Sequence, residues 1–404
     1  MSSTSRTTKS QPRLNPLLAR AHAAGVLEVD ALLADRSLRI VVCCGAGGVG
    51  KTTTSAALAL RAAEQGRKVV VLTIDPARRL AQSMGIEALD NTPREVPDVG
   101  GTGQLDAMML DMKRTFDDVV ISQASPEKAK QILENPFYVA VSSSFAGTQE
   151  YMAMEKLGQL DRDAQASGRW DLIVVDTPPS RNALDFLDAP ERLSSFLDGR
   201  FMKLLTAPAK GPAKLMTAGF GLVTKAITTI VGAQVLSDMQ AFVAAFDTLF
   251  GGFRQRAQRT YDLLKAPGTA FLVVAAPEPD ALREAAYFVE RLRGEDMPLA
   301  GLVLNRANLD TSPELSEAAA NAAAEKLRDS AEPGSPLARG LLRLHAEKKL
   351  IASREERLRQ RFAAGHPDVA AAVVPALPGD VHDLDGLRVI GDLLASPQAG
   401  RAEV

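Results

Sequence analysis

The sequence predicts an α/β fold, in which a doubly wound, mostly parallel sheet carries a phosphate-binding P-loop and a helical insertion subdomain. Short runs of β-branched and aliphatic residues alternate with helical patterns, which is typical of parallel strands joined by helices. A glycine-rich motif directly follows the first run, and two long helical stretches interrupt the later ones. The 404 residues are enough for one large domain with insertions.

Composition narrows the class of protein. The chain has 47 basic and 49 acidic residues, so its net charge of −2 gives no electrostatic reason to expect nucleic acid as a partner. Only 5% of the residues are aromatic, which leaves little material for base stacking. The two cysteines, Cys43 and Cys44, are adjacent and form no disulfide framework. These features favour the reducing cytoplasm as the location of the protein, and peripheral association with a membrane is the alternative.

Seven strands are expected, because continuous apolar runs bounded by turn residues are typical of parallel strands buried on both faces. Helices are expected over 52–64 and 279–293, and a charged, alanine-rich helix pair over 313–329 and 337–364. The expected strands are 38–44, 68–74, 105–110, 172–176, 270–275, 299–305 and 370–375.

The spacing of these patterns also predicts a division of the chain. Two stretches have helical periodicity and almost no strand signal, so we expect them to be helical insertions on one side of the sheet. The predicted parts are an N-terminal tail with a short helix (1–36), a P-loop core (37–111, 171–183 and 266–395), the helical insertions (112–170 and 184–265) and a C-terminal tail (396–404).

The motif at residues 45–52 reads GAGGVGKT, an unbroken G-x-x-x-x-G-K-[ST] between a predicted strand and a predicted helix. Its glycines let successive main-chain amides turn toward phosphate oxygens, and the helix start adds a positive dipole end. Lys51 is the predicted cation for the β- and γ-phosphates, and the Thr52 hydroxyl is a predicted Mg²⁺ ligand. The predicted nucleotide-binding residues of this segment are Gly45, Ala46, Gly47, Gly48, Val49, Gly50, Lys51, Thr52 and Thr53.

Two aspartates end predicted strands and complete the expected site. Asp75 follows VVVLTI and Asp176 follows LIVV, and the carboxyl ends of parallel strands line the binding crevice of such a sheet. Asp176 is predicted to hold Mg²⁺ through a water molecule, and Asp75 to position the attacking water. The alternative is that each is a solvated turn aspartate near a proline. Residues 304–308 read LNRAN and lack the aspartate typical of guanine recognition, which favours ATP over GTP.

Three segments together resemble a known family. GAGGVGKTT, TIDPARRLAQSMG and VVDTPPSRNALDFLDAP are similar to the P-loop, switch I and switch II of the ArsA family. That family includes bacterial arsenite-pump ATPases and the eukaryotic ATPases that target tail-anchored membrane proteins. The similarity extends to PEPDALREAAYFVERL and to LNR, covers most of residues 38–395, and is greatest to an actinobacterial anion-transporter-like subgroup. It implies a deviant Walker A P-loop fold that hydrolyses ATP with Mg²⁺.

The resemblance also implies roles for single residues. Asp75 would activate water, Asn305 would contact adenine, and residues 375–378 would close over the base. Family members carry a signature lysine after the first glycine of the loop, and this position is Ala46. We therefore expect a dimer with a paralogous ATPase subunit that has the lysine, and a homodimer is the alternative. Arg181, in switch II, is a candidate substitute for the missing charge, and the alternative is that it is an ordinary surface arginine.

Other family features are absent from the sequence. Two adjacent cysteines in one strand provide neither the clustered thiolates of arsenite regulation nor the Cys-x-x-Cys zinc clamp, so Mg²⁺ is the only metal expected. Residues 196–250 are rich in Phe, Met and Leu, which suits the binding of a hydrophobic or membrane-protein client. The alternative is that these residues form the core of the insertion or a dimer contact, which would have the same composition.

Three functions remain open from the sequence alone. The first is an ATPase switch that handles a hydrophobic client, the second an ATPase subunit that drives or regulates a membrane anion transporter, and the third a MinD/ParA-like positioning ATPase. The short polar C-terminal tail disfavours the third, because such proteins typically bind membranes or DNA.

Overall fold

The structure is a computed structural model of the whole chain. It describes a subset of the residues, and the predicted insertion 184–265, the apolar stretch 196–250 and Arg181 lie largely or wholly outside that subset. The described residues are 25–75, 79–136, 138–139, 142, 148–178, 255–330 and 332–396.

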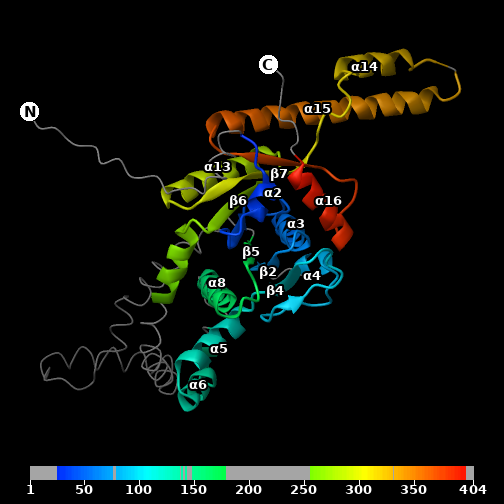
Figure 1. Cartoon of the computed structure of the whole chain (residues 1–404). Helices are drawn as coiled ribbons and strands as arrows, with labels where there is room; N and C mark the ends of the chain where they lie inside the picture. Colours follow the sequence, from blue (N-terminus) through cyan, green and yellow to red (C-terminus); the bar gives the residue numbers. More distant parts are fainter. Residues whose placement is uncertain are drawn as a thin grey trace, which may run out of the picture.

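The described strands form one eight-stranded sheet in the order β3-β4-β2-β5-β1-β6-β7-β8 (Figure 1). Every neighbouring pair is parallel except β3 and β4, so the predicted doubly wound, mostly parallel sheet is confirmed. The strands are β1 (Ile40–Cys44), β2 (Lys68–Thr73), β3 (Arg94–Glu95), β4 (Gln104–Met109), β5 (Leu172–Asp176), β6 (Thr269–Ala275), β7 (Leu299–Ala307) and β8 (Ala371–Pro375).

All seven predicted strands are present, with ends that shift by at most two residues. The strand β3 was not predicted, because it is a pair of exposed residues at the edge of the sheet and has no apolar run to mark it. The central strands β1, β5 and β6 are buried throughout, as expected for strands covered on both faces.

Helices cover both faces of the sheet (Figure 1). The core on one face includes residues of α2, α3 and α16, and the core on the other includes residues of α5, α6, α8 and α13. Cys43 belongs to the first core and Cys44 to the second, because consecutive side chains of a strand point to opposite faces of the sheet. The helices concerned are α2 (Val29–Ala34), α3 (Lys51–Glu64), α5 (Met112–Gln123), α6 (Pro126–Leu133), α8 (Thr148–Ser167), α13 (Pro279–Gly294) and α16 (Leu384–Ala395).

The segment between β4 and β5 is helical in its described part, as predicted, and its helices α5, α6 and α8 lie on one side of the sheet. The side chain of Asp111 starts α5 by accepting a hydrogen bond from Arg114 N at 2.9 Å. The assignment of these helices to a separate subdomain stays a prediction. A short helix, α4 (Arg79–Ser83), precedes β3.

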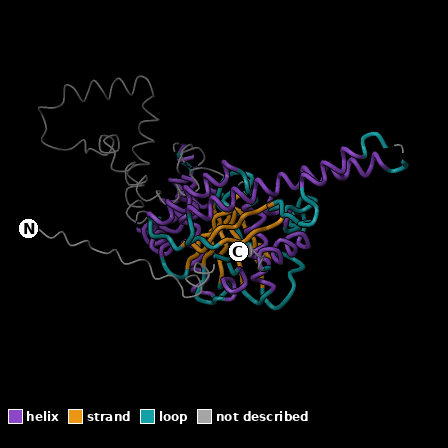
Figure 2. The backbone as a smooth tube through the Cα atoms, turned by 90° about the horizontal axis from the view of Figure 1, so that it is seen from above, coloured by secondary structure: helices purple, strands orange, loops and turns teal. Residues whose placement is uncertain are grey.

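A helical hairpin extends away from the sheet (Figures 1 and 2). It consists of α14 (Glu317–Lys326) and the long helix α15 (Ser335–Gly365), close to the predicted pair. The first helix is shorter than predicted because the side chain of Ser316 caps its start, accepting from Ala319 N at 3.2 Å. Near its base, Lys349 of α15 donates to both carboxylate oxygens of Asp310.

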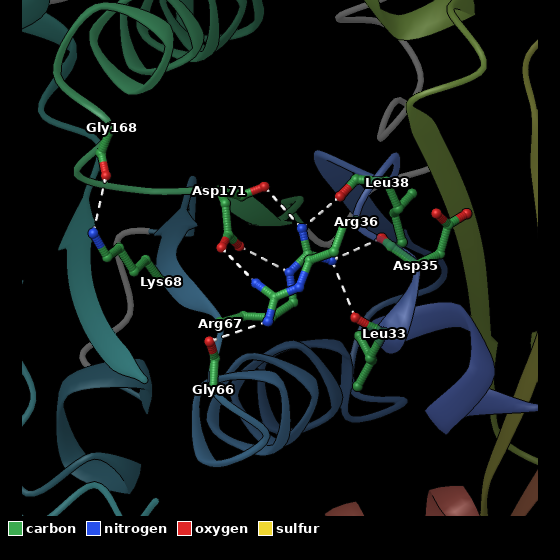
Figure 3. A network of polar contacts seen from close by, with 9 residues as sticks. All are labelled: Leu33, Asp35, Arg36, Leu38, Gly66, Arg67, Lys68, Gly168 and Asp171. Atoms are coloured by element: carbon green, nitrogen blue, oxygen red, sulfur yellow. Dashed lines mark hydrogen bonds and ion pairs between the residues drawn. The ribbon is translucent and has the colours of Figure 1, made fainter. Parts of the chain in front are cut away.

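Arg67 connects the amino ends of three parallel strands, at the edge of the sheet opposite the phosphate loop (Figure 3). Its side chain is 1% exposed. The guanidinium donates to the carbonyls of Leu33, Asp35, Leu38 and Asp171 and to the carboxylate of Asp171. A buried cation is tolerated here because these acceptors replace the lost water.

Candidate functional site

The glycines of the P-loop are required by its conformation. Gly48 and Gly50 have φ values of 78° and 89°, in the left-handed region that favours glycine. A Cβ at Gly45 would lie 2.1 Å from the carbonyl oxygen of Val274 in β6, and one at Gly50 would lie 2.2 Å from Asn305 Nδ2 in β7. The loop therefore passes too close to its neighbours for larger residues, and it ends where α3 begins, at Lys51.

Lys51 is buried at the start of α3, and its Nζ donates a hydrogen bond to Ala46 O at 2.7 Å. Burial lowers the pKa of Lys51, and the nearby carboxylate of Asp176 opposes this effect. The ammonium group thus lies across the loop with a neutral carbonyl as its hydrogen-bond partner. A phosphate would be a stronger acceptor for it, because hydrogen bonds between charged groups are shorter and stronger.

Asp176 is fully buried at the end of β5 and organises the candidate metal site. Its Oδ2 accepts hydrogen bonds from Thr52 Oγ1 at 2.7 Å and from Thr73 Oγ1 at 2.8 Å. Its Oδ1 is buried and has no hydrogen-bond partner. Burial raises the pKa of Asp176 to about 6, even though the two threonine hydroxyls and Lys51 stabilise the carboxylate.

These residues fit Mg²⁺. An orphaned, buried carboxylate oxygen is costly, and a hard cation with oxygen ligands would remove that cost. The Thr52 hydroxyl and Asp176 lie within hydrogen-bond distance of each other, so one ion could be held by both, directly or through water. The structure brings together the two residues that the sequence analysis proposed for the metal, and their role stays a prediction.

Asp75 lies at the same edge of the sheet, two residues beyond the end of β2. Its main-chain N donates to Thr73 Oγ1 at 3.2 Å, so the threonine that supports Asp176 also fixes the start of the segment that carries Asp75. Asp75 is half-buried, which leaves its side chain access to solvent. This placement suits the predicted handling of a water molecule and does not test it.

A cavity of about 350 Å³ adjoins the helix end of the P-loop and is the candidate base pocket. Thr53, Asn305 and residues 375–378 line it, and the last two of these are the residues predicted on the adenine side. Asn305 is buried, and its Nδ2 donates to Val49 O at 2.9 Å, which ties β7 to the loop. A contact between Asn305 and adenine stays a prediction.

The sequence analysis missed two residues of this site. Thr73 supports Asp176 from the neighbouring strand, and Arg306 lines the base pocket beside Asn305. A threonine at the end of an apolar run and an arginine after an asparagine have no distinctive pattern. Only the pairing of β2 with β5, which sets Thr73 opposite Asp176, could have indicated the first.

Within the described part of the chain, no group of three or more His, Cys, Asp or Glu side chains is arranged to hold a metal ion. Among the helices described, none combines the length and the apolar composition needed to cross a lipid bilayer.

A parallel sheet with a strand–P-loop–helix unit, a buried lysine in the loop and an aspartate at a neighbouring strand end defines a P-loop nucleotide hydrolase. Residues 38–328 match the family model of the ArsA ATPases, described as anion-transporting ATPases. The match covers more than half of the chain, so this protein belongs to the ArsA ATPase family and is an ATP-hydrolysing enzyme.

Curated relatives agree with this placement. The chain is 23% identical to the ATPase get3 of Schizosaccharomyces pombe over 91% of this chain and 94% of that protein. It is 30% identical to the ATPase GET3 of Malassezia globosa over 41% of this chain and 46% of the relative. It is 31% identical to the arsenical pump-driving ATPase of Acidiphilium multivorum over 38% of this chain. Because that match spans only 26% of the pump ATPase, the partners and the transported or targeted substrate are matters for proposal.

Proposed function

We propose that the chain is a Mg²⁺-dependent molecular switch, in which ATP binding and hydrolysis rearrange the helices next to the site. The observation that carries this proposal is the shared acceptor Asp176 Oδ2, which binds both Thr52 of the P-loop helix and Thr73 of β2. Mg²⁺ at Thr52 would alter these hydrogen bonds, so the metal and nucleotide are coupled to the strand that leads to Asp75.

A second set of contacts extends this coupling to α5. The carbonyl oxygen of Thr73 accepts a hydrogen bond from Leu110 N at 2.9 Å. The next residue, Asp111, caps α5. A displacement of Thr73 would therefore reach the first helix of the segment between β4 and β5 through one residue. Interactions that depend on the γ-phosphate and are lost on hydrolysis can bias such an element between two positions.

The chain supplies the remaining groups for phosphoryl transfer. The P-loop amides and Lys51 would bind and neutralise the β- and γ-phosphates, and Asp75 would orient the water that attacks the γ-phosphate. When bound, Mg²⁺ supplies further neutralisation of the phosphate oxygens. Burial of Lys51 and Asp176 excludes water around the reacting group, which strengthens both electrostatic interactions.

Hydrogen–deuterium exchange tests the switch directly. The protection of the α5 amides from exchange is expected to change when Mg²⁺-ATP is added. It should return toward its original level when ADP replaces ATP. The variant Asp75→Asn should hold the ATP-bound pattern, and Lys51→Ala should show no response. Equal exchange of α5 in the nucleotide-free, ATP and ADP states of the unaltered protein would contradict the coupling.

For the partner, we propose a paralogous ATPase subunit that supplies the lysine absent at Ala46. The support is the nearly buried methyl group of Ala46, which leaves no cation at this point of the loop. Light scattering and turnover of the isolated chain test this proposal. An ATP-dependent homodimer with full turnover would show that no second kind of subunit is needed.

For the client, we propose a hydrophobic or membrane-protein segment. The family and the composition of residues 196–250 support it. A fluorescent apolar helical peptide of about twenty leucine and alanine residues, a length typical of membrane spans, serves as the probe. We expect its anisotropy to depend on ATP in the Asp75→Asn variant, with Lys51→Ala as the control.

The family description as anion-transporting ATPases and the named arsenical pump-driving ATPase favour a second candidate, a subunit that drives or regulates an anion transporter. That candidate predicts no peptide binding and instead ATP-dependent retention of an integral membrane complex by Asp75→Asn. Recovery of neither the peptide nor a membrane complex would contradict both candidates.

A further inference from the structure

Arg306 and Asn305 are consecutive residues near the end of β7, and both side chains reach the P-loop. Asn305 Nδ2 donates to Val49 O at 2.9 Å, and Arg306 Nη1 donates to Gly48 O at 3.4 Å. Consecutive side chains of a regular strand point to opposite faces of the sheet. A regular β7 could therefore present only one of these two side chains to the loop.

An irregularity in β7 makes the double contact possible. The register between β7 and β8 shifts between Leu304 and Ala307, and Arg306 has a φ of 59°. The left-handed region is unfavourable for a residue with a Cβ, and such strain clusters at functional sites. Bulges beside active sites commonly redirect a side chain. The left-handed backbone at Arg306 thus costs conformational energy, and it turns a cationic side chain toward the loop.

Arg306 lines two cavities. One is the base pocket of about 350 Å³, and the other is a cavity of about 450 Å³ that Gly47, Gly48 and Val49 also line. The side chain is exposed, and among the described residues its guanidinium makes only the long hydrogen bond to Gly48 O. A guanidinium has five N–H donors, so most of its binding capacity is available to a ligand.

The base pocket needs a surface for the flat face of a purine. Among the described residues its lining contains no aromatic ring, and its apolar residues, which include Pro375, Leu377, Pro378 and Ile390, come from β8, α16 and the loop between them. Arg306 and Asn305 come from β7, and Thr53 comes from α3. A planar guanidinium stacks on an aromatic face, whereas a lysine ammonium acts as a compact point charge.

We propose that the guanidinium of Arg306 gives up its hydrogen bond to Gly48 O when a nucleotide binds. It then stacks on the adenine ring and closes the base pocket. Arg306 then acts as a specificity-determining residue that favours nucleotides with a purine base. This inference rests on the proposed nucleotide site. The opposing possibility is that Arg306 binds phosphate. The two possibilities differ in whether the contribution of Arg306 to nucleotide affinity requires the base.

The test compares Mg²⁺-ATP with inorganic tripolyphosphate by titration calorimetry. The variant Arg306→Gly removes the side chain and also fits φ of 59° without strain, so its melting temperature should be equal to or above that of the unaltered protein. We expect its ATP affinity to fall about tenfold, in the range of cation–π and stacking contributions, and its tripolyphosphate affinity to stay unchanged. Arg306→Lys should resemble Arg306→Gly, and Arg357→Ala, which removes an exposed arginine of α15 that lines neither cavity, is the matched control.

Three other outcomes of these titrations would each contradict a different claim. An equal loss of tripolyphosphate and ATP affinity, or full rescue by Arg306→Lys, would assign Arg306 to phosphate and overturn base stacking. Unchanged ATP affinity in Arg306→Gly would overturn the inference and leave the nucleotide site intact. Absence of ATP binding by the unaltered protein would overturn the proposed function, and the inference with it.

Discussion

The hydroxyl of Thr52 donates a hydrogen bond of 2.7 Å to the carboxylate of Asp176, although 124 residues separate them in the sequence. This contact joins the first turn of α3 to the end of β5 and places the candidate metal-binding pair beside the phosphate loop. The second carboxylate oxygen of Asp176 is buried without a partner. Such an unpartnered oxygen costs stability in the free protein, and it is the atom that the proposed cation would contact.

The first prediction follows from that orphaned oxygen. In Asp176→Asn, the amide oxygen can still accept from Thr52 and Thr73, but the negative charge is lost. We expect the enhancement of ATP binding by Mg²⁺ to fall about 10- to 100-fold, as for other residues that orient a metal's ligands. Stability in magnesium-free buffer should be retained or increased, because a neutral buried group costs less than a carboxylate. Calorimetry with and without Mg²⁺ measures the first effect, and an unaltered Mg²⁺ dependence would contradict the assignment.

The second prediction separates binding from chemistry. Lys51→Ala should abolish ATP turnover, because the loop loses the cation that lies across it. Asp75→Asn should keep ATP affinity within a few-fold and lose turnover, since the half-buried carboxylate is assigned to the water and not to the phosphates. Binding assays and steady-state phosphate release on both variants test this difference. Equal residual turnover in the two variants would show that the roles are wrong.

The third prediction concerns the closeness of the P-loop to β7. A methyl group at position 50 would lie 2.2 Å from Asn305 Nδ2, and φ at Gly50 is 89°. Gly50→Ala should therefore destabilise the protein by about 1–2 kcal/mol or more and abolish nucleotide binding. Gly294→Ala at the end of α13 is the matched control, because nothing lies within 4 Å of the added methyl group. Thermal melting and ATP titration measure both variants, and a Gly50→Ala protein that binds ATP normally would contradict the argument.

The sequence predicted the features that depend on local pattern. Apolar runs identified every strand of the sheet except β3, and the glycine motif located the loop that lies between β1 and α3. Asp176 could be chosen as a metal ligand because it ends an apolar run, and the structure places it beside Thr52. These residues belong to the motifs themselves, so reading them required no knowledge of the tertiary structure.

Features that depend on strand pairing or irregular backbone could not be predicted. Thr73 acts on Asp176 only because β2 lies next to β5 in the sheet. Arg306 reaches the P-loop only because β7 is irregular between Leu304 and Ala307. Neither the order of strands nor a single left-handed residue leaves a periodic signal in one sequence, so these two residues appeared only in the structure.

The fourth prediction compares two arginines that share one carboxylate. Arg67 and Arg36 both donate to Asp171, but the side chain of Arg67 is 1% exposed and that of Arg36 is 58% exposed. Arg67→Ala leaves several buried carbonyls without donors and should cost about 3–5 kcal/mol. Arg36→Ala should cost less than about 1 kcal/mol, as for exposed ion pairs. Urea unfolding of the two variants measures the difference, and similar losses would show that the buried network does not stabilise the fold.

The last prediction concerns the two cysteines. Burial raises the pKa of Cys43 to about 12 and also raises that of Cys44, and the two thiols face opposite sides of the sheet. At pH 8 the thiolate fraction of a group with such a pKa is on the order of 1 in 10,000, and the thiolate is the reactive form. The native protein should therefore release no colour with a disulfide thiol reagent until it is unfolded, when both cysteines react. Arsenite should likewise leave the rate of ATP hydrolysis unchanged, because thiols on opposite faces of a strand offer no shared site for a metalloid. Rapid reaction of one thiol in the folded protein, or activation by arsenite that Cys43→Ser abolishes, would contradict the buried, separated placement.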